Sequence, residues 1–140
     1  MPLTYRLASE ADLPAIVQLL ADDVLGAQRE AFQLPLPDSY QQAFRVIHTD
    51  PQQELAVVEL DGEIVATFQL TFIQYLTYQG GIRAQIEAVR VKDTHRGQGI
   101  GAAISSMPLT GPNSGGPTCC NLPPTKNAPM PFVFMNRWGL

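Results

Sequence analysis

The sequence predicts a single domain of the α/β (α+β) class, in which helices flank a mostly antiparallel central sheet. The 140 residues are 45% hydrophobic, a share that suffices for one core. Segments with the alternation of strands and segments with the spacing of helices follow one another in the order β-α-α-β-β-β. Asp61-Gly62 joins two of the strands as a tight hairpin, so these strands run antiparallel. A glycine-rich loop and the start of another helix come next.

The first part of the chain is predicted to form one strand and two helices. Residues 3–8 alternate apolar and polar side chains, as a half-buried strand does. Ser9 and Asp12 have the spacing of a helix cap, and apolar residues then recur at helical spacing. These apolar residues are Leu13, Ile16, Val17, Leu19, Leu20 and Val24. Residues 26–37 are expected to form a connector and residues 38–47 a second helix. One face of the second helix is formed by Tyr40, Ala43, Phe44 and Ile47.

Three further strands are predicted in the middle of the chain. They cover residues 54–60, 63–75 and 82–91, which are rich in β-branched and aromatic side chains. The last two strands are joined by a turn at Gln79-Gly80-Gly81. Together with the first strand, they supply the central sheet.

Charge and composition exclude several classes of protein. The net charge of −4 and the pI near 5.0 disfavour a nucleic-acid partner, which requires clustered Lys and Arg. No apolar run approaches the roughly 18 to 20 residues that a membrane-spanning helix needs, and the N-terminal residues do not follow the pattern of a signal peptide. We therefore expect a cytoplasmic protein without a membrane partner. Cys119 and Cys120 are adjacent and lack the spacing of zinc ligands, so no metal site is expected.

The glycine-rich loop has the composition of an anion-binding site. Gly97, Gly99 and Gly101 alternate with larger residues, so backbone N–H groups can converge on an anion at the start of a helix. A pyrophosphate would suit this loop, and Arg96 adds a charged donor beside it.

Three other interpretations compete with this one. A Rossmann fingerprint fits Gly97, Gly99 and Ala102, but the preceding strand ends about five residues too early and no acidic residue follows about 20 residues later. A phosphate-binding P-loop would need a terminal Gly-Lys-Ser/Thr, which is missing. The third interpretation is a glycine-rich turn without a ligand.

On these residues, the chain from 1 to about 105 resembles the GNAT superfamily of N-acetyltransferases. The family signature is a strand, a loop ending in Gln/Arg-x-x-Gly-x-Gly/Ala and a helix, and residues 96–101 fill it after the strand IEAVRV. The resemblance implies that acetyl-CoA is bound, with its pantetheine arm paired to the backbone of Val89, Arg90 and Val91. Its pyrophosphate would lie on a loop formed by Arg96, Gly97, Gln98, Gly99, Ile100, Gly101 and Ala102.

The resemblance also implies a general base. Glu87 lies two residues before the segment expected to pair with pantetheine, where many family members place such a carboxylate. The alternative is a strand carboxylate that points to solvent or pairs with Arg83 or Arg90. Tyr75 and Tyr78 are candidates for the lining of an acceptor pocket, although aromatic residues in strands commonly serve packing.

Two functions follow from the resemblance. The first is transfer of an acetyl group from acetyl-CoA to a primary amine of a small molecule or peptide. The second is a non-catalytic acyl-CoA-binding fragment or pseudoenzyme that acts through a partner or through self-association. If the helix that follows the glycine loop ends near residue 105, it leaves apolar sheet surface uncovered, and such a surface would favour a homodimer.

The segment 106–140 departs from the family pattern and is expected to be irregular. All thirteen acidic residues lie between Glu10 and Asp93, and seven of the twelve prolines follow Ser105. We therefore place the end of an incomplete acetyl-CoA-binding domain at residue 105. Family members continue with a strand and a helix that carries a tyrosine, commonly in Arg-Phe-Tyr-Glu, which protonates the departing thiolate. This run is missing here.

A shifted reading frame would restore that run. Codons formed from the third base of one residue and the first two bases of the next are forced to Ala at Met130-Pro131 and to Glu at Met135-Asn136. Phe134-Met135 permits only Tyr or His, and residues 131–136 can be read as Leu-Arg-Phe-Tyr-Glu. Our hypothesis is that the tail, from between Gly101 and Met107 onward, is a one-base frameshift product, which would leave weak or no turnover. The alternative is a genuine low-complexity tail.

Overall fold

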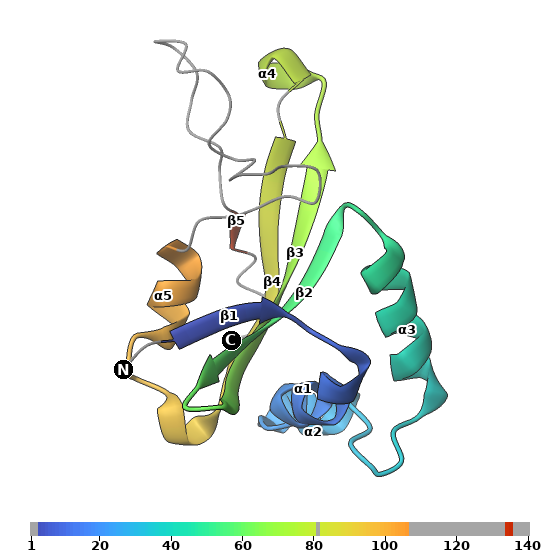
Figure 1. Cartoon of the computed structure of the whole chain (residues 1–140), viewed down its shortest axis with the longest axis vertical. Coiled ribbons are helices and arrows are strands. Elements are labelled where there is room, and N and C mark those ends of the chain that lie inside the picture. The colour runs from blue at the N-terminus through green and yellow to red at the C-terminus, as the bar shows by residue number, and fades with distance from the viewer. Residues whose placement is uncertain (1–2, 81, 107–133, 136–140) are drawn as a thin grey trace.

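The computed structural model describes residues 3–80, 82–106 and 134–135, and these build a single sheet with helices on both sides (Figure 1). The strands follow one another across the sheet in the order β1-β2-β3-β4-β5. Their bounds are β1 Leu3–Leu7, β2 Gln53–Leu60, β3 Glu63–Gln74, β4 Ile82–Val91 and β5 Phe134–Met135. The pairs among β1 to β4 are antiparallel, whereas β5 runs parallel to β4. The predicted fold class is confirmed.

The helical segments connect the strands and cover the sheet. They are η1 Glu10–Asp12, α1 Leu13–Leu20, α2 Val24–Arg29, α3 Asp38–Thr49, α4 Thr77–Gly80, η2 Asp93–His95 and α5 Ile100–Ser106. Adjacent residues of β2 project to opposite faces of the sheet, since Val57 packs with α1 and α3 while Val58 packs with α5. The sheet is therefore covered by α1 and α3 on one face and by α5 on the other.

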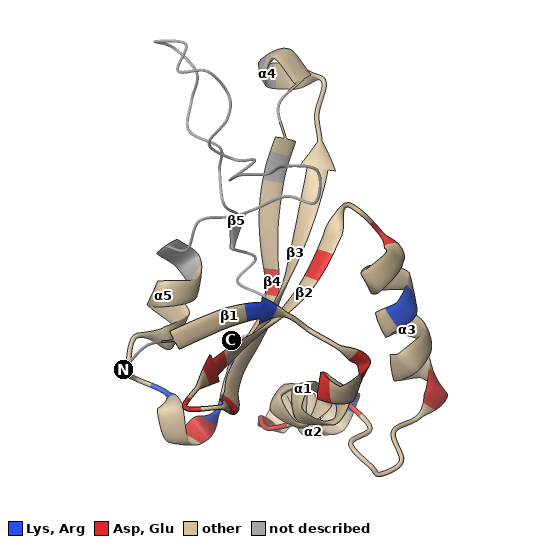
Figure 2. Ribbon diagram, in the orientation of Figure 1, with Lys and Arg blue, Asp and Glu red and all other residues tan. Residues whose placement is uncertain are grey.

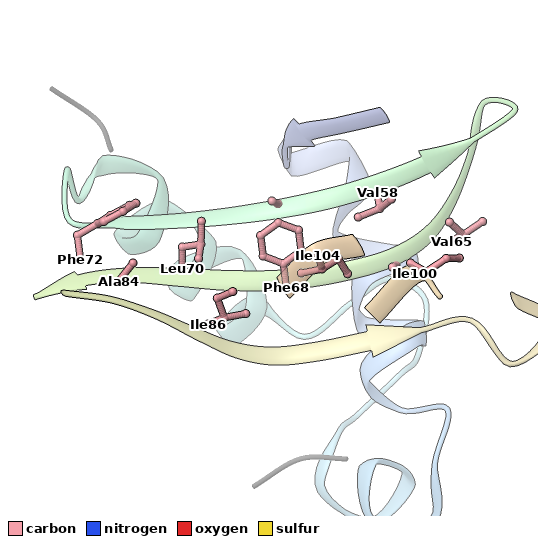
Figure 3. Packing of buried hydrophobic residues seen from close by; sticks show 11 residues of the cluster. Val58, Val65, Phe68, Leu70, Phe72, Ala84, Ile86, Ile100 and Ile104 are labelled. Atoms are coloured by element: carbon pink, nitrogen blue, oxygen red, sulfur yellow. The ribbon is translucent and has the colours of Figure 1, made fainter. Parts of the chain in front are cut away.

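The larger hydrophobic cluster lies between the sheet and α5 (Figure 3). Phe68 and Leu70 of β3 and Ile86 of β4 are at most 1% exposed, and they belong to the same cluster as Ile100 and Ile104 of α5. The isoleucines of α5 are four residues apart, so they share one face of the helix. This packing fixes the start of α5 against β4, directly after the glycine loop.

The predicted first helix and connector are corrected by the structure. The helix ends at Leu20, a new helix α2 begins at Val24 within the expected connector, and Val24 is 77% exposed instead of facing the core. The physical reason is that the Asp23 side chain accepts a hydrogen bond from the backbone N–H of Gly26 and caps a separate helix. Helical spacing alone does not reveal such an interruption.

The remaining predicted elements between residues 3 and 106 are confirmed with small shifts. The second predicted helix continues to Thr49, and Ala43 is exposed although Phe44 is buried. Asp61 and Gly62 have positive φ angles of 52° and 81°, as the predicted hairpin turn requires. The turn predicted between the last two of these strands is formed by the single-turn helix α4.

Most of the tail lies outside the described residues. The predicted domain boundary at residue 105 lies at the end of α5, whereas the predicted irregular segment and the frameshift concern mainly residues 107–133 and 136–140. One expectation is corrected, because Phe134–Met135 forms a short strand beside Gln85 and Ile86 where the tail was expected to supply none. An extended segment at the outer edge of β4 satisfies backbone groups that a sheet edge leaves unpaired.

The described residues offer neither a membrane-spanning helix nor a metal-binding cluster. None of their helices combines the length and apolar character needed to cross a membrane. Within the same residues, His, Cys, Asp and Glu side chains form no group of three that would hold a metal ion.

Candidate functional site

Strand β4 contains a bulge directly after Glu87, the candidate general base. Gln69 of β3 pairs with Glu87, and Thr67 pairs with Arg90, so the single residue Phe68 faces two residues of β4. Ala88, one of these two, has a φ of 53°, the left-handed conformation that bulges and strained sites adopt. The bulge therefore bends β4 immediately after Glu87.

The bulge also decides which side chains share a face. Ile86 before it and Val89 after it both pack against the cluster under α5. Because strand residues alternate between faces, Glu87 and Arg90 project to the opposite face, toward α1 and α3. Without the extra residue, positions 87 and 90 would lie on different faces. The bulge thus places a carboxylate and a guanidinium on one side of the sheet.

The outer edge of β4 changes character at Glu87. Strand β5 pairs with Gln85 and Ile86, and among the described residues no strand pairs with positions 87–91 on that side. An open strand edge is the kind of surface that an extended ligand can extend by backbone hydrogen bonds. The predicted pantetheine segment, Val89 to Val91, lies on this edge. Of its side chains, only that of Arg90 is buried, and its Nη1 donates to the Val89 carbonyl at 2.9 Å.

Glu87 is half-buried and its carboxylate is held by a neutral side chain. Gln85 Nε2 donates a hydrogen bond to Glu87 Oε1. The alternative pairing with Arg90 is not found, because Arg90 Nε lies 3.6 Å from Asp23 Oδ2. Arg90 is only 7% exposed, and its Nε has no hydrogen-bond partner among the described residues. The side chain of Arg83 lies outside the part that the structure describes.

The glycine loop leaves open space beside its backbone. Gly97 and Gly99 have positive φ angles of 77° and 81°, and a Cβ added at Gly97, Gly99 or Gly101 would meet no heavy atom within 4 Å. Gln98 and Ala102 are exposed, whereas Ile100 is buried in the core and offers only its backbone to this side. The residues present therefore fit the pyrophosphate of acetyl-CoA, since a ligand can approach the main chain here.

Arg96 lies beside this loop but interacts with other groups. Its Nε donates to the Val91 carbonyl at 3.0 Å, and its Nη1 forms an ion pair with Asp93. Its Nη2 lies 3.9 Å from Asp22 Oδ2. The guanidinium thus already interacts with two carboxylates, and these would compete with a phosphate for it.

Tyr75 is not brought to the bulge. Tyr75 follows β3 directly and lies six residues beyond Gln69, the partner of Glu87, which corresponds to roughly 20 Å along a strand. The side chain of Tyr78 is outside the described part. The structure therefore separates Tyr75 from Glu87 along the hairpin.

Sequence reasoning missed three residues near the site. Asp22 and Asp23 contact the two arginines that flank the end of β4, and Gln85 holds Glu87. A signal existed for Asp23 and for Gln85. An Asp before a short helical segment is a cap signal, and residues two apart in a strand share a face.

Comparison with known proteins identifies the family. The sequence model of the Acetyltransferase (GNAT) family matches residues 21–104. The chain belongs to this family. GNAT proteins use acetyl-CoA as the acetyl donor, and the fold described above is that of a GNAT acyltransferase. No curated protein matches the chain significantly.

Solved structures place the GNAT chain among similar folds. A transcriptional regulator from Bacillus halodurans C-125 is 50% identical with a TM-score of 0.70, over 74% of this chain and 69% of that one. Glucosamine-6-phosphate N-acetyltransferase from Arabidopsis thaliana is 19% identical, with a TM-score of 0.58, over 75% and 70% of the two chains. A predicted acetyltransferase from Clostridium acetobutylicum, solved with acetyl-CoA, is 20% identical with a TM-score of 0.54, over 74% and 69%. The last two likenesses concern the fold.

Proposed function

We propose that this GNAT protein transfers the acetyl group of acetyl-CoA to a primary amine of a small molecule or peptide, with Glu87 as general base. The observation that carries the proposal is the bulge at Ala88. It turns β4 at the point where pairing with β5 ends, and it presents Glu87 beside an open strand edge. Bulges of this kind commonly re-aim side chains next to active sites.

The binding residues follow from the same strand and the loop after it. The backbone of Val89, Arg90 and Val91 holds the extended pantetheine arm, and the loop of residues 96–102 holds the pyrophosphate. The open space beside Gly97, Gly99 and Gly101 supports this assignment. When bound, acetyl-CoA supplies a thioester whose carbonyl carbon bonds to the amine nitrogen as the C–S bond breaks.

Glu87 moves a proton. An acceptor amine is an ammonium near neutral pH, and its nitrogen has no lone pair until a proton leaves. The carboxylate of Glu87 takes that proton, directly or through one water molecule. The second proton that the nitrogen loses ends on the departing thiol, so the reaction as a whole releases one proton.

We further propose that this chain turns over weakly. Residues 106–140 contain no tyrosine, so this segment lacks the residue that protonates the departing thiolate in family members. General acid catalysis by a positioned side chain is typically worth about 10²- to 10⁴-fold in rate. A one-base frameshift after the cofactor loop would account for this loss. The family match, which ends at residue 104, supports a domain that ends near residue 105.

A second candidate is a non-catalytic acyl-CoA-binding protein that acts through a partner or as a homodimer. The missing tyrosine favours it, because the cofactor edge is retained while the acid is not. The net charge of −4 disfavours nucleic acid, and Figure 2 shows Lys and Arg dispersed among Asp and Glu over the described elements. A cytoplasmic location stays part of the proposal.

Calorimetry with acetyl-CoA tests the binding site. We expect the full chain to bind, and we expect Gly99→Glu to abolish binding because a carboxylate would occupy the place of the pyrophosphate. Gly62→Glu is the matched control, since Gly62 has the same φ of 81° and the same open space in the β2–β3 turn.

Release of thiol from acetyl-CoA, measured with a panel of amines, then separates the two candidates. Slow, amine-dependent release supports the transferase, and binding without release supports the non-catalytic protein. A full chain that does not bind acetyl-CoA, or a Gly99→Glu variant that binds as well as the control, would contradict both.

A further inference from the structure

Gln85 and Glu87 form a pair on one face of β4. They are separated by Ile86, which is 1% exposed and belongs to the cluster under α5. Since Ile86 projects to that face, its two neighbours project to the other. Gln85 Nε2 donates to Glu87 Oε1, so the pair is joined by a hydrogen bond as well as by its position.

The two members of the pair have different supports. Gln85 is paired with Thr71 of β3 on one side and with Phe134 of β5 on the other. Glu87 lies beyond β5, next to the bulge, where one side of β4 is open. Gln85 lies where β4 is paired on both sides, so it can hold the carboxylate of Glu87, which lies where the strand bends.

The chemistry of the partner suits a base that receives an ammonium. A cationic partner would neutralise the carboxylate and repel the incoming ammonium, whereas an amide fixes one oxygen and leaves the negative charge in place. The nearby guanidinium of Arg90 is directed to Asp23, on the α1–α2 connection. Among described side chains, the amide of Gln85 is the hydrogen-bond partner of Glu87.

We propose that Gln85 is a positioning residue for acetyl transfer, which holds Oε1 of Glu87 so that Oε2 takes the proton of the acceptor amine. This inference rests on the proposed role of Glu87. The acceptor it favours is a cationic amine, because the pair has a net charge of −1 once Glu87 is ionised.

A double-mutant cycle in the full chain tests the inference. Thiol release at saturating acetyl-CoA is compared for the wild type, Gln85→Leu, Glu87→Gln and the double variant. We expect Gln85→Leu to lower the rate about tenfold without changing the calorimetric Kd for acetyl-CoA. The double variant should be as slow as Glu87→Gln alone, because Gln85 acts through Glu87. Gln69→Leu is the matched control, since this half-buried glutamine of β3 donates to Gln53 instead.

If the double variant loses rate by the product of the two single losses, the inference is overturned and the proposed function is left intact. An unchanged rate in Glu87→Gln would overturn the role of Glu87 and this inference with it.

A second measurement needs no turnover. The side-chain amide protons of Gln85, followed by NMR during a pH titration, should shift as Glu87 gains its proton and should lose this response in Glu87→Gln. Amide protons that respond equally in both proteins would overturn the pairing.

Discussion

Arg6 illustrates how single residues stabilise the fold. Its Nη1 and Nη2 donate to the two oxygens of Asp12 at 2.6 and 2.9 Å, and Nη2 also lies 2.7 Å from Glu59 Oε1. These hydrogen bonds from Arg6 lower the pKa of Asp12 to about 2, against desolvation, which raises it. The ion pair joins β1 to η1, directly before α1.

The depressed pKa of Asp12 predicts a loss of stability in acid. A carboxyl whose pKa falls from 3.8 to about 2 on folding stabilises the protein above pH ~4, and this contribution is lost as the pH falls toward 2. The contribution is about 2 kcal/mol, from 1.36 kcal/mol per pKa unit. The free energy of unfolding, measured in urea, should therefore fall less steeply between pH 5 and 2 in Asp12→Asn than in the wild type. Glu10→Gln is the control, since its ion pair with Arg45 is exposed and 3.8 Å long. Parallel curves for wild type and Asp12→Asn would contradict the prediction.

The candidate site was predictable only in part at the residue scale. Glu87 and the glycines stand in a recognisable family motif, so the sequence alone nominates them. The bulge that gives Glu87 its position is not visible in the sequence, because nothing in Ile-Glu-Ala-Val marks Ala88 for a positive φ. The contacts of Glu87 with Gln85 and of Arg90 with Asp23 depend on that geometry, so the sequence alone does not predict them.

At the scale of elements, the strands were predictable and the first helices were not. Alternation and turn residues locate β2, β3 and β4 to within one residue at every end, because each strand has its own local pattern. The break between α1 and α2 depends on Asp23 capping a new helix. Helical spacing of apolar residues continues through the break and conceals it.

Gly26 provides a test of that break. A Cβ at this position would lie 2.0 Å from the Leu20 carbonyl oxygen and 2.9 Å from Asp23 Oδ1, so the α1–α2 connection closes only around glycine. We expect Gly26→Ala to lower the free energy of unfolding by about 1–3 kcal/mol, measured in urea. Gly101→Ala in α5 is the control, because a Cβ there meets nothing within 4 Å. A Gly26→Ala protein as stable as the control variant would show that the connection has room to relax.

At the scale of the whole molecule, the tail determines the proposed activity. Replacing residues 107–140 with the alternative-frame sequence should raise amine-dependent thiol release by about 10²-fold or more, because a leaving-group acid is supplied. The Kd for acetyl-CoA should change far less. The control is the same protein with Phe in place of the tyrosine encoded across Phe134-Met135. Equal rates for both proteins, or a locus in which no frame encodes Leu-Arg-Phe-Tyr-Glu there, would contradict the frameshift.

The order of strands in the sheet has a consequence for how the protein folds. Each strand from β1 to β4 pairs with its neighbour in the chain, and the last of these pairings is complete at Val91. Ile100 and Ile104 then close the main core within one further helix. Residues 3–106 can thus assemble the four antiparallel strands and the main core without pairing with the tail. Mutations after Ser106 are therefore expected to alter the chemistry of the product more than its ability to fold, which lets a gene drift in that region while still yielding a folded domain.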